Sequence, residues 1–149
     1  MNATLRKKIL WIDDDYRILR AFLKKVADEG VDVDYAGNAL EGYLKIKEKG
    51  GGYDLILVDI ILPLLPMTEG AFEIPEEIKG WEYADDLGIL LVKEIAQLHP
   101  LPKIAILSIL DESTVQKKLD AAKVLKIFPK QTISAAELKE SLMQLLMEA

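Results

Sequence analysis

The sequence predicts an α/β fold in which a doubly wound parallel sheet of five strands is covered by helices on both faces. Five short apolar runs alternate with segments whose apolar residues repeat at helical spacing, an order typical of parallel strands joined by crossover helices. Most of the apolar runs are continuous, as expected for strands that are buried on both faces. A chain of 149 residues is long enough to bury a sizeable core in one domain.

The expected strands differ in how much of their surface is buried. Four runs are apolar throughout or nearly so, which suits strands inside the sheet. Val31 to Tyr35 instead alternates apolar residues with Asp32 and Asp34, a pattern that suits an edge strand with one face in water. The four buried runs are Lys8 to Ile12, Leu55 to Ile60, Ile104 to Leu107 and Val124 to Phe128.

Two helices are expected before the third strand. Apolar residues from Ile18 to Val26 repeat at helical spacing, and Asp15 is predicted as the N-cap of this first helix. Asn38 is the predicted N-cap of the second helix because Glu41 follows three residues later, and Gly50 marks its end. The apolar residues expected on the second helix are Leu40, Tyr43 and Leu44.

Three further helices follow the third strand. Apolar residues from Leu87 to Leu98 form one stripe of a helix that ends before Pro100. A short helix with a weaker pattern is expected over Ser113 to Ala121. Ser134 and Glu137 form a capping box, which predicts the start of the last helix.

An insertion breaks this rhythm after the third strand. A connection from a strand to a helix usually has roughly two to six residues, but about residues 64–86 separate the third strand from its helix. Phe72 to Ile74 and Trp81 to Tyr83 each alternate apolar and acidic residues, which predicts a small hairpin. We therefore expect a single domain over residues 1–149 that carries this insertion and no output domain.

Charge and composition argue against several function classes. A net charge of −6 is unfavourable for a nucleic-acid surface, since phosphate binding needs clustered Lys and Arg. The absence of cysteine excludes a disulfide framework and a zinc-thiolate site. No apolar run is long enough to cross a bilayer. We therefore expect no nucleic-acid partner, no membrane insertion and a cytoplasmic location.

Polar residues stand where four of the five strands end. Asp13 and Asp14 follow the first strand, Asp59 lies at the end of the third, Ser108 follows the fourth and Lys130 follows the fifth. The carboxyl ends of parallel strands meet at one edge of a sheet, so these side chains should form one polar site. Neighbouring carboxylates repel by roughly 4 kcal/mol per pair at an effective dielectric of about 20. The site therefore calls for a cation, and Mg²⁺ suits oxygen ligands combined with phosphate. One carboxylate could then attack phosphorus.

These five residues resemble the pattern of the receiver domain of two-component response regulators. That family has an acidic pair after the first strand, an acceptor aspartate after the third, a Ser or Thr after the fourth and a Lys after the fifth. The resemblance implies a flavodoxin-like fold with strand order 2-1-3-4-5. It also implies that a histidine kinase or phosphotransfer protein supplies a phosphoryl group to Asp59.

The resemblance assigns roles to individual residues. Asp14, Asp59 and the backbone carbonyl of Ile61 would bind Mg²⁺, and Asp13 would lie beside these ligands without contacting the metal. The phosphoryl group would contact Ser108 and Lys130, Ile127 would be the switch position, and Ile61 and Leu110 would tune hydrolysis.

The sequence also departs from the family pattern. The family's lysine is usually followed by proline, whereas Pro129 precedes Lys130 here and Gln131 follows it. The switch position is commonly aromatic in the family and is Ile127 in this chain. The small residue that usually follows the hydroxyl residue is replaced by Ile109.

The leading interpretation is a phosphorylation-controlled signalling protein that acts by binding another protein. It would catalyse only its own Mg²⁺-dependent phosphorylation and dephosphorylation. The alternative is a pseudo-receiver that binds a partner constitutively, which the departures at Lys130 and Ile127 favour and the intact acidic cluster opposes. A magnesium-dependent phosphatase acting on small molecules is disfavoured because Ile61 occupies the position where a general acid would be needed.

Overall fold

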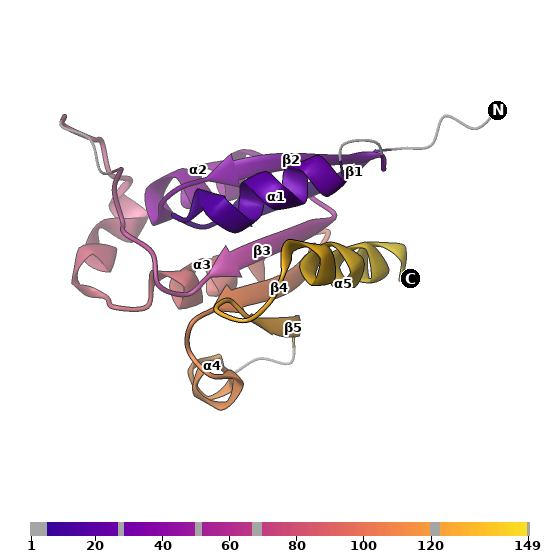
Figure 1. The fold of residues 1–149 in the computed structure, drawn as a ribbon. Helices are drawn as coiled ribbons and strands as arrows, with labels where there is room; N and C mark the ends of the chain where they lie inside the picture. Colours follow the sequence, from indigo (N-terminus) through magenta and orange to yellow (C-terminus); the bar gives the residue numbers. More distant parts are fainter. Residues whose placement is uncertain (1–5, 27–28, 50–51, 67–69, 120–122, 149) are drawn as a thin grey trace.

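Five parallel strands form one sheet in the order β2-β1-β3-β4-β5, which confirms the predicted topology (Figure 1). The structure, a computed structural model, describes residues 6–26, 29–49, 52–66, 70–119 and 123–148. Val31–Ala36 is at the edge of the sheet, as its alternating pattern predicted. The prediction that Val124 to Phe128 is buried on both faces is wrong, because Val124–Pro129 is the opposite edge strand and Leu125 is 50% exposed. The strands are β1 Lys7–Ile12, β2 Val31–Ala36, β3 Leu55–Asp59, β4 Lys103–Ser108 and β5 Val124–Pro129.

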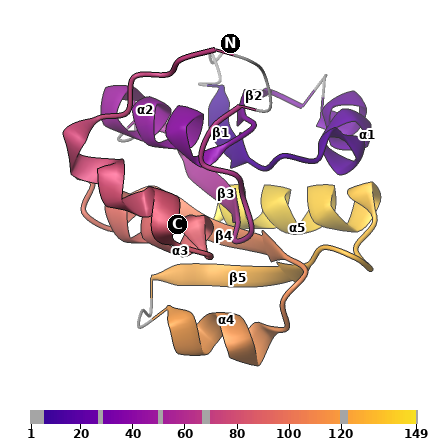
Figure 2. The same ribbon diagram turned by 90° about the vertical axis from the view of Figure 1, so that its left-hand side faces the viewer.

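Helices cover both faces of the sheet (Figures 1 and 2). The first and last helices pack on one face, and the second, third and fourth pack on the other. Within the described residues, no helix has both the length and the apolar character needed to cross a membrane. The helices are α1 Tyr16–Val26, α2 Ala39–Lys49, α3 Leu87–Ile95, α4 Glu112–Lys118 and α5 Ala135–Met147, with a 3-10 helix, η2, at Glu76–Tyr83.

The core consists of two halves separated by the sheet. Successive strand side chains point to opposite faces, so Ile9 and Trp11 of β1 pack towards α1 and α5, while Leu10 and Ile12 pack towards α2 and α3. Trp11 meets Phe22 of α1 edge to face, with 5.2 Å between the ring centroids. Both faces of β1 and β3 are therefore buried, which explains why these runs are continuously apolar.

The register of the central strands brings their carboxyl ends to one level. Ile12 of β1 is paired with Val58 of β3, so the residues that follow each of them stand side by side. On the other side of β3, Asp59 is paired with Leu107, the residue before Ser108. The sheet therefore places the polar residues of three strands at one edge.

The predicted helix caps are present at α2 and α5. The Asn38 side chain accepts a hydrogen bond of 2.9 Å from the Glu41 N–H, and Glu41 accepts one of 3.0 Å from the Gly37 N–H. Ser134 and Glu137 form the predicted capping box. These caps satisfy N–H groups that a helix start leaves without partners.

The start of the fourth helix differs from prediction. The prediction began this helix at Ser113, but α4 begins at Glu112, because Asp111 caps it through a 2.8 Å hydrogen bond from the Thr114 N–H. The predicted ends of two helices, Gly50 and Ala121, lie outside the described residues. Leu40, Tyr43 and Leu44 all lie on α2 as predicted; Leu40 and Tyr43 are in the core, whereas Leu44 is 46% exposed.

The insertion contains a 3-10 helix, so the predicted hairpin at Phe72 to Ile74 and Trp81 to Tyr83 is wrong. A 3-10 helix has about three residues per turn, which places Ile78 and Trp81 on the same side of η2. Ile78 is completely buried, and Trp81 contacts the ring of Tyr43 in α2 at 5.6 Å between centroids. The spacing of three between Ile78 and Trp81, rather than the alternation, is the pattern by which η2 packs on the core and on α2.

Candidate functional site

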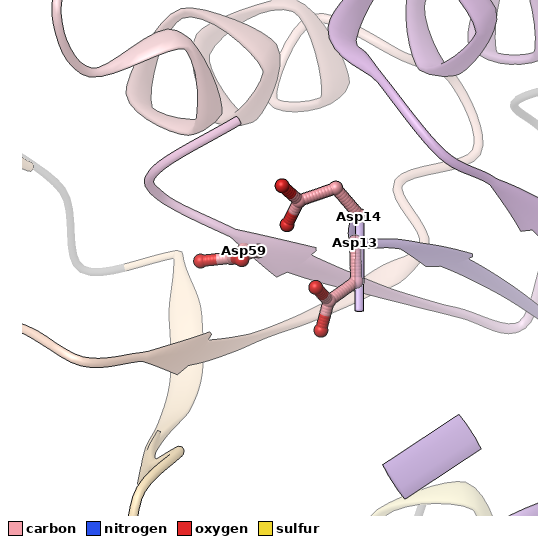
Figure 3. A group of neighbouring side chains, drawn as sticks. All are labelled: Asp13, Asp14 and Asp59. Carbon is pink, nitrogen blue, oxygen red and sulfur yellow. The ribbon is translucent and has the colours of Figure 1, made fainter. Parts of the chain in front are cut away.

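Three aspartates gather beyond the carboxyl ends of β1 and β3 (Figure 3). Each of Asp13, Asp14 and Asp59 offers a carboxylate oxygen, and these oxygens lie within 4.8 Å of one another. Asp13 and Asp59 are only 1% and 3% exposed, while Asp14 is open to solvent. The cluster therefore has a buried side and an accessible side.

Hydrogen bonds fix the position of Asp13. Its carboxylate accepts from the backbone N–H of Asp15 at 2.9 Å and from the indole N–H of Trp11 at 3.4 Å. Its carbonyl oxygen accepts a hydrogen bond from the hydroxyl of Tyr35, on the neighbouring edge strand. Asp13 is thus held from both its side chain and its backbone.

Lys130 links two of the carboxylates. Its ammonium donates hydrogen bonds of 2.7 Å to Asp13 and 2.8 Å to Asp59, and its side chain is only 10% exposed. The backbone N–H of Lys130 donates to the carbonyl of Ser108 at 2.9 Å. The lysine therefore reaches the acidic cluster even though Pro129 stands before it.

Burial and neighbouring charges shift the pKa values of Asp59 and Lys130. Desolvation raises the pKa of Asp59 from 3.8 to about 7; the hydrogen bond from Lys130 opposes the rise and the charge of Asp13 adds to it. Burial alone would lower the pKa of Lys130, but its hydrogen bonds to Asp13 and Asp59 outweigh that effect and raise it. A second cation beside the cluster would favour the ionised form of Asp59.

The other predicted positions surround Asp59. Ser108 is 1% exposed, and its hydroxyl accepts a hydrogen bond of 2.9 Å from the Leu110 N–H. The Ile61 N–H donates to the Asp59 carboxylate at 3.2 Å, and the Ile61 side chain is 39% exposed. Ile127 lies on β5 and packs, partly buried, against the core half that contains α2 and α3.

The side chain of Asp15 is directed to α1 and not to the acidic cluster, as its predicted capping role implies. Its carboxylate accepts from the backbone N–H of Arg17 at 3.0 Å, which caps α1, and pairs with the Arg17 guanidinium at 2.8 Å. Hydrogen bonds from Arg17 lower the pKa of Asp15 to about 2. The prediction that Asp15 is an N-cap is confirmed.

Sequence reasoning missed Gly88, at the start of α3. Its N–H donates to the carbonyl of Ile60 at 3.0 Å. A Cβ atom at this position would lie 2.1 Å from the carbonyl oxygen of Asp59, closer than atoms can approach. The helix can therefore sit directly against the main chain of Asp59 only with glycine here. A glycine inside a helical pattern gives no such signal by itself.

The donor set suits a hard divalent cation. All three acidic side chains present oxygen, and the exposed Asp14 leaves one side of the cluster accessible to water and to a second ligand. Mg²⁺ prefers such a site, with one or two carboxylates and further oxygen ligands from water or phosphate.

Comparisons with known proteins identify the fold. No protein-family model matches the chain. The CheY-like response regulator receiver domain protein of Methanospirillum hungatei superposes with a TM-score of 0.68 at 23% identity, covering 95% of this chain and 94% of that one. This chain has the receiver fold. A chain of the CheX-CheY-BeF3-Mg²⁺ complex from Borrelia burgdorferi also has the receiver fold, with a TM-score of 0.68 and 17% identity over 95% of this chain and 90% of that chain.

One relative supports the same assignment from sequence. The transcriptional regulatory protein CpxR homolog of Haemophilus influenzae is 36% identical over 67 residues, which is 45% of this chain. The match spans only 28% of that protein's length. The receiver fold therefore has support from sequence as well as structure, while the activity of the longer protein belongs to that protein.

Proposed function

We propose that this chain is a phosphorylation-controlled receiver domain that accepts a phosphoryl group on Asp59 and signals by binding another protein. A histidine kinase or phosphotransfer protein of the cytoplasm would supply the phosphoryl group. The observation that carries the proposal is the bridge of Lys130 between the buried Asp13 and Asp59, beside the exposed Asp14. This is a charged centre with one accessible side, as a transfer from another protein requires.

The residues divide the chemistry among them. A carboxylate oxygen of Asp59 forms the new bond to phosphorus as the P–N bond of a phosphohistidine breaks, and the leaving imidazole keeps its electron pair. Lys130 and Ser108 would contact phosphoryl oxygens. Ser108 ends the strand next to Asp59, and the Lys130 ammonium, from the loop after β5, donates to the Asp59 carboxylate. Positive charge aimed at the transferred group is what lowers the barrier.

Magnesium would be held on the accessible side of the cluster. Asp14, Asp59 and the backbone carbonyl of Ile61 are the protein ligands that we propose, with Asp13 kept beside them by its own hydrogen bonds. The bound ion would neutralise the charge that phosphoryl oxygens and carboxylates bring together. The Borrelia burgdorferi neighbour, whose complex contains BeF3 and Mg²⁺, supports this choice of metal.

A pseudo-receiver is the second candidate, and one observation favours it. Ile127 occupies the switch position and packs against the core, so the chain has no aromatic side chain there to change position with phosphorylation. In that case the fold would present the same binding surface at all times. The two candidates differ in whether Asp59 is phosphorylated at all.

Mass measurement on the intact chain tests the proposal. We expect incubation with acetyl phosphate and Mg²⁺ to add one phosphoryl mass to the wild type and none to Asp59→Asn, because the amide cannot act as the nucleophile. Asp15→Asn is the matched control: Asn also caps helices, so this variant should be labelled like the wild type. Labelling of Asp59→Asn would mean that another residue is the acceptor. An unlabelled wild type would favour the pseudo-receiver.

A further inference from the structure

The insertion forms a groove on the outside of α2 that the proposed phosphoryl chemistry does not use. The groove has a volume of about 960 Å³ and lies between η2, the segment before it and α2. Its lining consists of four apolar residues and four charged ones: Leu44, Phe72, Ile74 and Pro75, and Glu73, Glu76, Lys79 and Glu82. In Figures 1 and 2 the inserted segment runs beside α2 and α3.

The groove is part of a packed structure. Ile78 anchors η2 in the core with no exposed surface, and Trp81 and Glu77 both contact Tyr43 of α2. The segment leading to η2 packs as well, because Phe72 is partly buried against the same core half. The groove therefore keeps its shape without a partner, which reduces the entropy cost of binding.

Apolar surface remains open in the groove. Leu44 is 46% exposed in the middle of α2, while Leu40 and Tyr43 of the same helix are buried. Phe72 and Ile74 are only half-buried. An exposed leucine alone needs no explanation, but its position beside two further apolar side chains in one groove provides surface that a partner's side chains could bury.

The charges of the groove favour a basic occupant. Glu73, Glu76 and Glu82 against Lys79 give the lining a net charge of −2. Lys79 is paired with Glu76 at 2.7 Å, and in the described part of the chain neither Glu73 nor Glu82 forms a salt bridge. Glu82 accepts a hydrogen bond from the Tyr83 hydroxyl. Neither of these two exposed carboxylates is paired with a cation in the described residues, so both can pair with a partner's Lys or Arg.

We propose that this groove binds a short, basic, amphipathic segment of a partner protein. Large apolar side chains of the segment would contact Leu44, Phe72 and Ile74, and its Lys or Arg side chains would pair with Glu73 and Glu82. Complementary charge of this kind speeds encounter and selects among partners. A second copy of the chain is a poorer occupant, because each copy carries a net charge of −6 and an acidic groove. The proposal does not depend on phosphorylation of Asp59.

Peptide display on the full chain tests this inference. A library of random twelve-residue peptides would be selected on the wild-type chain with Mg²⁺ present, and the most enriched peptide would be synthesised with a fluorescent label. We expect enriched peptides to combine Lys or Arg with at least two large apolar residues. Fluorescence anisotropy would then give the Kd of the synthesised peptide.

Matched charge reversals locate the binding site. Glu73→Lys with Glu82→Lys should raise the Kd at least tenfold, whereas Glu112→Lys with Glu140→Lys, which changes the net charge equally at exposed positions outside the groove, should change it less than twofold. Circular dichroism would confirm that both double variants fold. The inference is overturned if no peptide is enriched, if enriched peptides lack basic residues, or if both double variants weaken binding equally.

Two further results would also overturn the inference. A large loss of affinity in Asp59→Asn, with none in Glu73→Lys with Glu82→Lys, would place the peptide at the acidic cluster rather than in the groove. Sedimentation that reveals a dimer, dispersed by Glu73→Lys with Glu82→Lys, would make a second copy the occupant. Normal peptide binding by Asp59→Asn would support the groove even if Asp59 proved not to be an acceptor.

Discussion

At the scale of single residues, the site depends on one ammonium placed between two buried carboxylates. Lys130 neutralises part of the charge of Asp13 and Asp59, and each carboxylate keeps a further hydrogen bond from a backbone N–H. Removing one member of a buried ionic group leaves an uncompensated charge, which is costly. Asp14 differs because it is exposed, so it can be replaced without that penalty.

Asp14→Ala should therefore weaken magnesium binding while leaving the fold intact. The substitution removes one proposed ligand and one negative charge from the accessible side of the cluster, and we expect the affinity to fall at least tenfold, about 1.4 kcal/mol. Isothermal titration with MgCl₂ measures this, with Asp15→Asn as the control that keeps the cluster. An affinity unchanged in Asp14→Ala would mean that the metal is bound by other groups.

Ile61 and Leu110 should make phospho-Asp59 long-lived. Hydrolysis needs a water aligned with the phosphorus–oxygen bond, and neither side chain can donate or accept a hydrogen bond to orient it. Ile61→Asn or Leu110→Glu should shorten the lifetime roughly tenfold if about 1.4 kcal/mol of the barrier is recovered. Ile61 is the better position for this substitution, because its side chain is 39% exposed and a polar group there would not be buried.

Decay of the phosphorylated mass after removal of the donor, with Mg²⁺ kept constant, measures this lifetime. Ile109→Asn provides the control, because Ile109 is exposed and follows Ser108 directly. Rapid decay of the wild type, or equal lifetimes in all four proteins, would show that these two side chains do not control the water.

At the scale of elements, the insertion belongs to the core and is more than a loop added to it. Ile78 of η2 is completely buried among residues of α2 and α3, and Trp81 packs on Tyr43. The sequence could not reveal this, because three residues of alternation fit a strand and a 3-10 helix equally well. Only the contact with α2 decides between them.

Ile78→Ala should consequently destabilise the whole domain. Removing a completely buried Ile side chain costs about 2–5 kcal/mol, and we expect a loss in this range from urea denaturation. Tyr83→Ala, in the same helix, should cost less than about 0.5 kcal/mol, because Tyr83 is 85% exposed. Similar losses in the two variants would mean that the insertion is independent of the core.

At the scale of the whole molecule, the fold was predictable because its three central strands are buried on both faces. The continuous apolar runs at β1, β3 and β4 could be read directly, and the parallel arrangement then placed Asp13, Asp59 and Ser108 together. The position of Lys130 was harder to predict, because the proline that usually follows the lysine in the receiver pattern is absent here. Its N–H bond to the Ser108 carbonyl, which positions it, is a tertiary contact with no local sequence signal.

The stability of the metal-free domain should fall as the pH rises from about 4 to about 7. The pKa of Asp59 is raised from 3.8 to about 7, so the folded state holds a proton that the unfolded state has already lost across this range. The stabilisation from the proton on Asp59 is full below pH 3.8, the ordinary pKa, and is lost above about pH 7, the raised pKa. Asp59→Asn, which cannot ionise, should lack this component.

Thermal denaturation in EDTA at pH 4.5 and pH 8 checks this expectation. The Tm of Asp59→Asn minus the Tm of the wild type should be more positive at pH 8 than at pH 4.5. Saturating Mg²⁺ at pH 8 should raise the Tm of the wild type more than that of the variant. A difference between the two proteins that is the same at both pH values would contradict the assignment of the raised pKa to Asp59.

The close approach at Gly88 has a mechanical consequence for this domain. The first turn of α3 touches the main chain of Asp59 and Ile60 with no side chain between them. Only a few residues join η2 to that turn. The connection is therefore short, and we expect a displacement of η2 to move the main chain of Asp59. Coupling between two sites is reciprocal in free energy. If a ligand on the insertion altered the geometry at Asp59, then a change at Asp59 would alter the affinity for that ligand by the same factor.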